Sequence, residues 1–271
     1  MKIKPWLFAL ACATFLVRPG AAQAPLASPY ELLGETIPYS STFSTVPYFP
    51  EVLQFEIKWG VFSVGTANLK VDRIVKFRGE PAYYIVSEAK SNGFCDTFYK
   101  VRDLNESWMH AVQMRSLGYS KKLREGGFFR DEWVLYDYDK KTFLSKRVNK
   151  KGEESYTEGT IPGSVQDVLS SLYYIRPMKF KPGDEIILDV NTRSNWPFVI
   201  KVHQREKITV PAGTFDTILV EPVVRQEGIF VQKGKRLRIW MTDDDRHIPI
   251  LMKVEIVFGN ITAYLTEPLK Q

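Results

Sequence analysis

Three consecutive aspartates, Asp243, Asp244 and Asp245, stand close to His247 and so bring together side chains that could bind a metal ion. A calcium loop of the EF-hand type needs spaced ligands, a glycine and a distal glutamate, and this stretch lacks that pattern. The flanking segments read RLRIWMT and IPILMKVEI, which have strand character, and aspartate is favoured in turns because its carboxylate accepts backbone hydrogen bonds. We therefore interpret the aspartates as a turn between two strands, and we expect neither a metal nor a cofactor.

The other reactive side chains are scattered along the chain. His110, His203 and His247 show no metal-ligand spacing such as H-E-x-x-H, and solitary histidines on β-structure are usually satisfied core or surface residues. Cys95 would act as a nucleophile only beside an imidazole or another activating neighbour. We interpret it as a small buried hydrophobic residue.

Local catalytic motifs are absent, because the sequence contains no G-x-S-x-G elbow, no P-loop and no Rossmann fingerprint. A site assembled from distant positions stays open as an alternative. Glu106, Asp137, Asp139 and Glu221 are carboxylates that could converge in a hydrolase of envelope glycan or peptide. Two carboxyl groups about 5 to 9 Å apart in one cleft would indicate such an enzyme. We expect a protein that is not an enzyme.

Large aromatic side chains are frequent on the predicted strands and supply a second kind of candidate site. In a curved sheet they either fill the core or line an apolar cavity that holds a ligand. The candidates for a ligand cavity are six aromatic residues and two leucines: Trp59, Phe62, Tyr84, Trp108, Trp133, Leu169, Leu172 and Trp240.

Strands must position most of these side chains, because a period of two dominates the sequence from residue 52 onward. In VLQFEIKWG, for example, Leu53, Phe55 and Ile57 alternate with polar residues, which is typical of a half-buried strand. Similar short runs follow, with Gly, Asn and Asp between many of them. The pattern predicts a mostly β fold, with one large curved antiparallel sheet or half-barrel.

One segment has helical periodicity instead. In PGSVQDVLSSLYYIRP the apolar residues recur every three or four positions, which places them on one face of a helix. Ser164 is suited to cap the start of this helix, and Pro177 ends it because proline lacks an amide hydrogen. We predict one amphipathic helix over residues 164–176, packed on the sheet.

The N-terminal region has two parts that precede the folded body. Residues 1–24 combine Lys2 and Lys4 with a short apolar run and an A-x-A site, which is the pattern of a cleaved secretory signal peptide. Residues 25–50 are rich in Pro, Ser and Thr and predict an extended arm that lies on the body. We expect residues 51–267 to form a single β-rich domain, and we expect no stable membrane span after cleavage.

The charge of the chain depends on its leader. Residues 1–24 carry three of the 37 basic residues and none of the 31 acidic ones, so cleavage lowers the net charge from +6 to +3. The remaining charges of both signs are interspersed, which gives no support to nucleic-acid binding. Cleavage also leaves Cys95 as the one cysteine, so an internal disulfide is not expected.

Several motifs in a fixed order resemble a bacterial exported family known only as domain of unknown function 3108. They read FEIKWGVFSVGTANLKV, DLNESWMH, SVQDVLSSLYYIR, VPAGTFDTILVEP and IWMTDDDRHIPILMKVEIVFGNITAYL, and they span most of residues 52–265. The resemblance implies a location in the Gram-negative envelope and brings no activity and no catalytic residue. The chain also looks remotely similar to the periplasmic lipoprotein carriers, in which a curved sheet wraps around helices to hold acyl chains. Such a likeness concerns the fold, and fold does not fix function.

Taken together, these observations predict an exported periplasmic protein without enzymatic activity. We expect it to bind an apolar or amphipathic envelope component, such as a lipid, or an envelope protein as partner. The alternatives are the envelope hydrolase described above and a structural adaptor whose exposed sheet edge recruits an extended peptide.

Overall fold

The protein is organised around one antiparallel sheet. In the computed structural model, which describes residues 27–44, 49–223, 236–256 and 259–269, fifteen strands join this sheet. In chain order they are β1 (Leu33–Ile37), β2 (Glu51–Trp59), β3 (Phe62–Phe77), β4 (Glu80–Ser91), β5 (Arg102–His110), β6 (Ser116–Glu125), β7 (Phe128–Asp137), β8 (Thr142–Asn149), β9 (Glu154–Thr160), β10 (Glu185–Asn191), β11 (Asn195–Val210), β12 (Gly213–Val223), β13 (Leu237–Thr242), β14 (Pro249–Glu255) and β15 (Asn260–Leu265).

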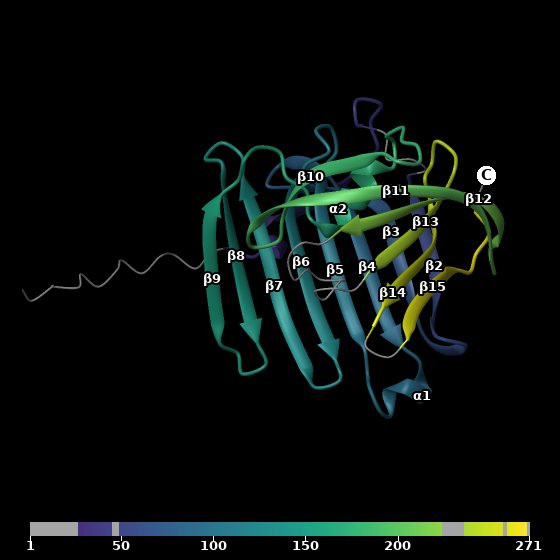
Figure 1. Ribbon diagram of the computed structural model, residues 1–271. Coiled ribbons are helices and arrows are strands. Elements are labelled where there is room, and N and C mark those ends of the chain that lie inside the picture. The colour runs from purple at the N-terminus through teal and green to yellow at the C-terminus, as the bar shows by residue number, and fades with distance from the viewer. Residues whose placement is uncertain (1–26, 45–48, 224–235, 257–258, 270–271) are drawn as a thin grey trace, which may run out of the picture.

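The strands follow one another in space as a continuous ribbon (Figure 1). Their order is β10-β11-β12-β13-β14-β15-β2-β3-β4-β5-β6-β7-β8-β9, and β1 pairs with the last part of β3. The sheet is open, because β10 and β9 form its two edges. The predicted mostly β fold with a large curved antiparallel sheet is therefore confirmed.

The alternation in the sequence sets which side chains face the interior. In β2, Leu53 and Phe55 are buried, whereas Val52 and Gln54, which alternate with them, are exposed. Successive side chains of a strand point to opposite faces, so one parity of each strand forms the inner face of the curved sheet.

The sheet curls until one end lies across the other. In Figure 1, β10 and β11 cross in front of β4 to β7, and the helix α2 (Val168–Ile175) lies between the two layers. The segment before α2 ties them together, because Gln166 forms a parallel bridge with Val190 of β10. The hydroxyl of Tyr136 on β7 also donates a hydrogen bond of 2.5 Å to the carbonyl of Asn191. The inner face is thus a deep half-barrel around one helix.

This helix begins later than its sequence pattern predicted. Its N-cap is Asp167, whose carboxylate accepts hydrogen bonds from the backbone amides of Leu169 and Ser170, so Ser164 is outside the helix. The predicted helix over residues 164–176 was wrong at its start because the preceding segment is held extended by the bridge between Gln166 and β10. The structure also contains a short helix α1 (Gly93–Asp96) and a 3-10 helix η1 (Pro29–Leu32) that the sequence pattern did not predict.

A buried ion pair fixes the far end of α2. Arg176 caps the helix, is fully buried, and donates two hydrogen bonds of 2.6 and 2.8 Å to the carboxylate of Glu51 on β2. The Arg176 Nε atom donates to the carbonyl of Arg246 at 3.0 Å, so most of its donors are used. Because an uncompensated buried charge is costly, this pair determines where the helix can sit on the sheet.

The outer face of the sheet carries a second core. Trp108 is fully buried there, stacked on Phe77 at 5.0 Å between ring centroids, and Tyr84 and Trp133 belong to the same cluster. The N-terminal segment covers this cluster, since Tyr30 of η1 meets the ring of Trp108 edge-on. In the region of residues 25–50, then, η1 and β1 pack directly on the sheet.

The sequence also predicted a signal peptide and no stable membrane span after its cleavage. The predicted signal peptide over residues 1–24 lies outside the described residues. In the part of the chain that the structure describes, no helix is both long and apolar enough to cross a membrane.

Candidate functional site

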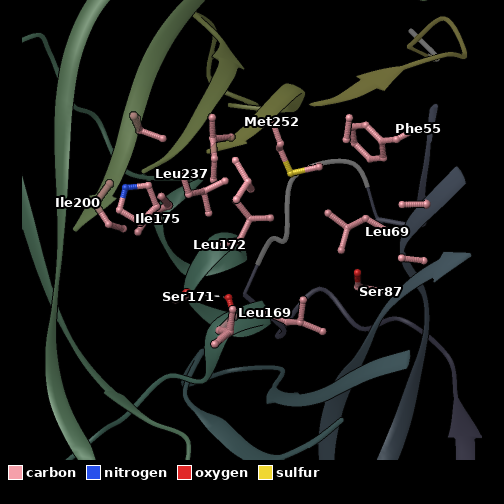
Figure 2. Close-up of a pocket in the computed structure, with 18 of the residues that line it drawn as sticks. Phe55, Leu69, Ser87, Leu169, Ser171, Leu172, Ile175, Ile200, Leu237 and Met252 are labelled. Carbon is pink, nitrogen blue, oxygen red and sulfur yellow. Dashed lines mark hydrogen bonds between the residues drawn. The ribbon is translucent and has the colours of Figure 1, made fainter. Parts of the chain in front are cut away.

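An apolar cavity of about 260 Å³ lies between α2 and the inner face of the sheet (Figure 2). The helix contributes Leu169 and Leu172, and strands β2 to β4 and β10 to β15 contribute the other walls. The polar side chains that line it are those of Ser87 and Ser171, because Asn68 alternates with the inward-facing Ala67 and Leu69 and points to the outer face. The cavity is larger than the roughly 150 Å³ apolar cavities that bind benzene in other proteins. Its size and lining suit a hydrocarbon group.

The residues that line the cavity differ in how far they are buried. Some of the lining residues are buried, as are Leu69 and Ile200. Ile57 near the end of β2 and Val254 near the end of β14 are half-buried. Both lie toward the end of the sheet where α1 is drawn in Figure 1. Half-buried lining residues also occur on α2, at Val168 and Leu172, so the cavity is partly open.

Two of the eight predicted cavity residues, Leu169 and Leu172, line this cavity. Three others, Tyr84, Trp108 and Trp133, lie in the outer core on the opposite face of the sheet. They occupy the alternate positions of β4, β5 and β7, so their side chains point away from the helix. Their placement as cavity residues was wrong for that reason.

The last three predicted residues also lie outside the cavity. Trp240 follows Ile239, which lines the cavity, and therefore points to the other face, where its indole donates a hydrogen bond of 2.7 Å to Glu206. Trp59 and Phe62 flank the turn between β2 and β3 and are 47 and 70% exposed. The aromatic residues that do line the cavity are Phe55, Trp196 and Phe198, and none of them was among the eight candidates.

The actual walls are mostly aliphatic, and the sequence signal for part of them was the strand alternation. Phe55 and Ile57 share the inward parity of β2, and both line the cavity. Met252 and Val254 do the same on β14. Which of these inward positions face an open space instead of a neighbour depends on the path of α2, and local sequence does not contain that path.

The four carboxylates proposed for a hydrolase do not converge. Glu106 on β5 accepts hydrogen bonds from the hydroxyls of Tyr30 and Tyr84 on the outer face. Asp137 accepts from the backbone amide of Lys140 at the turn after β7, where Asp139 is exposed. Glu221 lies on β12 at the other end of the strand order, beside three basic side chains, those of His203, Arg236 and Arg238.

A different pair of carboxyl groups lies at the α1 end of the inner face. Asp103 on β5 and Glu125 on β6 share a hydrogen bond, and Asp103 also accepts from the backbone amide of Arg124 at 2.9 Å. Burial, together with the neighbouring Asp103, raises the pKa of Glu125 to about 7, and burial raises the pKa of Asp103 as well. Glu125 therefore stays protonated to a higher pH than an isolated glutamate does.

The aspartates at 243–245 occupy the turn between β13 and β14, as the sequence pattern predicted. Asp243 accepts a hydrogen bond of 2.7 Å from Arg205, and Asp244 accepts from Thr242 and from the backbone amide of Arg246. Among the described residues, no group of three or more His, Cys, Asp or Glu side chains is arranged to hold a metal ion.

The histidines and the cysteine lie apart from one another. His110 is beside Glu80, His203 is beside Glu221, and His247 contacts the carbonyl of Arg176. Cys95 lies in α1 and is half-buried, so its interpretation as a buried core residue was wrong.

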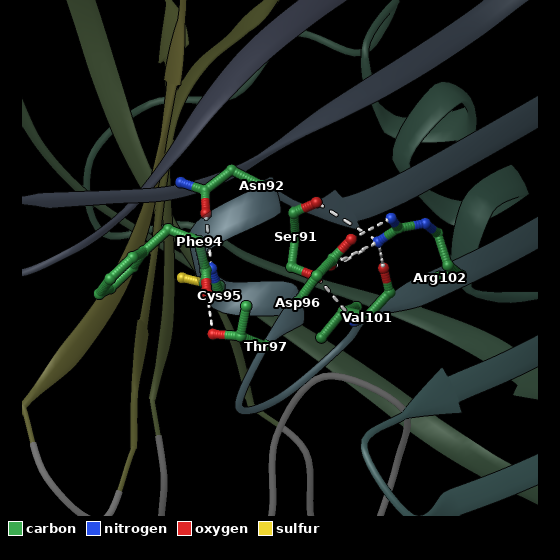
Figure 3. A network of polar contacts seen from close by, with 8 residues as sticks. All are labelled: Ser91, Asn92, Phe94, Cys95, Asp96, Thr97, Val101 and Arg102. Atoms are coloured by element: carbon green, nitrogen blue, oxygen red, sulfur yellow. Dashed lines mark hydrogen bonds and ion pairs between the residues drawn. The ribbon is translucent and has the colours of Figure 1, made fainter.

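The turn that contains α1 is held by a polar network (Figure 3). Arg102 donates hydrogen bonds of 3.0 and 2.6 Å to the two carboxylate oxygens of Asp96, and Ser91 donates a further one. These bonds lower the pKa of Asp96 to about 2. The network anchors a turn on which Phe94 and Phe98 are 75 and 78% exposed. With Trp59 and Phe62, they make this end of the sheet rich in exposed aromatic rings.

Comparisons with known proteins agree with this architecture. A family model described as "Protein of unknown function (DUF3108)" matches residues 54–266. No curated protein matches the sequence. Among solved structures, the fold is similar to a beta-barrel-like protein of the domain of unknown function DUF1849 from Brucella abortus. That similarity has a TM-score of 0.50 and 6% sequence identity, and it covers 80% of this chain and 95% of the other. This match confirms a curved, beta-barrel-like fold, and at this identity it concerns the fold alone.

Proposed function

Because the chain belongs to the DUF3108 family, described as a protein of unknown function, we propose its function from its cavity: it binds the apolar part of a lipid-like ligand. The observation that carries the proposal is the cavity between α2 and the sheet, whose side chains are apolar apart from Ser87 and Ser171. Apolar cavities with a few polar groups are the usual form of small-molecule sites in proteins.

The energetics favour a linear hydrocarbon chain. Each methylene group moved from water into an apolar site contributes about 0.8 kcal/mol, which corresponds to about a fourfold gain in affinity. Affinity for a series of alkyl ligands should rise by about this factor per methylene and level off when the chain fills the cavity. We propose that the protein does this in the periplasm, which is supported by the signal-peptide pattern of residues 1–24 and by the envelope location that the family resemblance implies.

A substitution that fills the cavity tests the proposal directly. Ala67 on β3 lines the cavity, and the side chain of Ala67→Phe would occupy it. The matched control is Thr66→Phe, because Thr66 is the preceding residue of the same strand, is exposed, and does not line the cavity. We expect Ala67→Phe to reduce binding of a fluorescent long-chain acyl probe at least tenfold and Thr66→Phe to leave it unchanged.

Two results would overturn the proposal. One is that the purified protein binds no acyl probe and shows no co-purifying lipid in native mass spectra. The other is that both phenylalanine variants bind the probe equally well while their melting temperatures match that of the wild type.

A further inference from the structure

The inner face of the sheet changes from apolar to charged along a single row of residues that pair across neighbouring strands. Leu53, Leu69 and Ser87 are neighbours across β2, β3 and β4, and Leu69 and Ser87 line the apolar cavity. The next residues in the same row are Asn105 on β5 and Lys121 on β6. Neighbouring strands lie about 4.8 Å apart, so Lys121 is about 10 Å from Ser87, a wall of the cavity.

The row ends in a cluster of charges. Lys121 is paired with Glu132 on β7, and Glu132 is paired with Arg147 on β8. Two more arginines reach the same place, Arg130 from the inward parity of β7 and Arg193 from the turn between β10 and β11. We call these five side chains the cationic cluster.

The cluster holds more positive charge than its own carboxylate can neutralise. Glu132 is 2% exposed and receives Lys121 at 3.2 Å, Arg147 at 2.5 Å and Arg193 at 3.7 Å. Arg130 is attracted by Glu132 and Glu125 over a longer range. The other charged groups facing this region are Glu125 and its hydrogen-bonded neighbour Asp103, so even with both ionised the acidic groups here number three against four basic side chains.

The contacts of the basic side chains also offset only part of the free energy that these charges lose when they are buried away from water. Burial lowers the pKa of Lys121 and of Arg130, and neighbouring positive charges act in the same direction. The Nε atom of Arg193 is buried and has no hydrogen-bond partner among the described residues. A cluster whose only purpose was to neutralise Glu132 would need one cation, because each extra buried charge costs free energy. An additional anion at this place would offset that cost.

We propose that the cationic cluster binds the oxyanion of an amphipathic ligand whose hydrocarbon chain lies in the apolar cavity. Arg147 and Arg193 present planar guanidinium groups that suit a carboxylate or a phosphate. Their side chains are 34 and 20% exposed, so an anion can reach them from the concave side of the sheet. This inference rests on the proposed function and names the chemistry of the ligand head.

Ligands that differ only in the head group test the inference. Dodecanoate and dodecyl phosphate carry an oxyanion, methyl dodecanoate carries none, and inorganic phosphate lacks the chain. We expect the two amphipathic anions to bind at least tenfold more tightly than the ester in calorimetric titrations, because charge-assisted hydrogen bonds are strong. A larger preference for dodecyl phosphate would identify a phosphate head, and the reverse order would identify a carboxylate.

Variants of the cationic cluster test binding of the ligand head separately from binding of its hydrocarbon chain. Arg147→Gln and Arg130→Gln should each reduce the affinity for the anions about tenfold or more and leave the affinity for the ester within about twofold. Lys146→Gln is the matched control, because Lys146 precedes Arg147 on β8 and pairs with Glu154 instead of Glu132. Arg147→Lys keeps the charge but not the planar guanidinium, so it should recover only part of the lost affinity for the anions while the melting temperature stays close to that of the wild type.

The outcomes distinguish this inference from the proposed function. If the anions and the ester bind equally, or if the arginine variants bind the anions as the wild type does, the cationic cluster is not a head-group site while the cavity proposal stands. If none of the alkyl ligands binds, both proposals fail. If inorganic phosphate alone binds as tightly as dodecyl phosphate, the cluster is an anion site that is independent of the cavity, and the inference is overturned.

Discussion

The two halves of the inner face are built from the same strands and the same alternation, yet they present opposite chemistry. Around the cavity, β2 to β4 and β10 to β15 point aliphatic side chains at α2. On β5 to β8 the equivalent inward positions hold Asn105, Lys121, Glu132 and Arg147. The alternation decides which residues face inward, and it does not decide whether the inward residues are apolar or charged. An interior with one apolar half and one charged half suits an amphipathic ligand, which has an apolar chain and a charged head.

The helix α2 contacts both layers of the curled sheet, and its anchor gives the largest expected effect. Glu51→Gln removes the carboxylate that pairs with the fully buried Arg176 and should lower the free energy of unfolding by about 3 to 5 kcal/mol. Urea titration followed by circular dichroism measures this change. Because the helix would no longer be fixed, the variant should also lose binding of the acyl probe.

The double variant Glu51→Leu with Arg176→Met tests whether the stability lost in Glu51→Gln comes from the uncompensated charge of Arg176. Replacing both partners removes the uncompensated charge, so we expect most of the lost stability to return. A single variant that unfolds within about 1 kcal/mol of the wild type would show that the pair does not hold the helix.

The start of α2 gives the next largest effect. Asp167 is fully buried, caps the helix, and accepts hydrogen bonds of 2.6 and 2.5 Å from Ser107 and Ser116. Asp167→Ala should therefore cost about 2 kcal/mol, since it removes the cap and leaves two buried hydroxyls without their acceptor. Ser164→Ala is the control: this residue has the side chain of a cap but lies outside the helix, so its replacement should change stability by about 0.5 kcal/mol or less. Equal losses from both substitutions would contradict the observed helix start.

The contrast between Asp167 and Ser164 also shows how far the sequence could predict the structure. The period of two identified the strands and the inward parity of Phe55 and Ile57, because that signal is contained within one strand. The start of α2 was missed because it depends on contacts far away in the sequence: the bridge between Gln166 and β10, and the hydrogen bonds of Asp167 with Ser107 and Ser116. The cationic cluster was missed for a related reason, since Lys121, Glu132 and Arg147 meet only after three strands have paired in register.

The smallest predicted effect concerns the carboxyl pair at the α1 end of the charged half. The pKa of Glu125 rises from 4.5 to about 7 on folding, so the folded state favours the protonated form. The stabilisation that this proton provides is fully present below pH 4.5 and is lost as the pH rises through about 7. Glu125→Gln keeps a neutral side chain at every pH, and it should melt about 2 °C above the wild type at pH 8 and close to it at pH 4.

A control on the apolar half completes this test. Glu88 on β4 is exposed, and Glu88→Gln should give the same difference from the wild type at both pH values. If Glu125→Gln were destabilising at pH 8 relative to pH 4, Glu125 would be a stabilising charge, and its raised pKa would be ruled out.

The division of the interior is tested most directly by a crystal structure of the protein with dodecanoate. We predict that the hydrocarbon chain contacts Leu69, Leu172 and Met252 and that the carboxylate lies within hydrogen-bonding distance of Arg147 or Arg193. A chain bound elsewhere on the molecule, or a carboxylate pointing into solvent at the α1 end of the cavity, would contradict it.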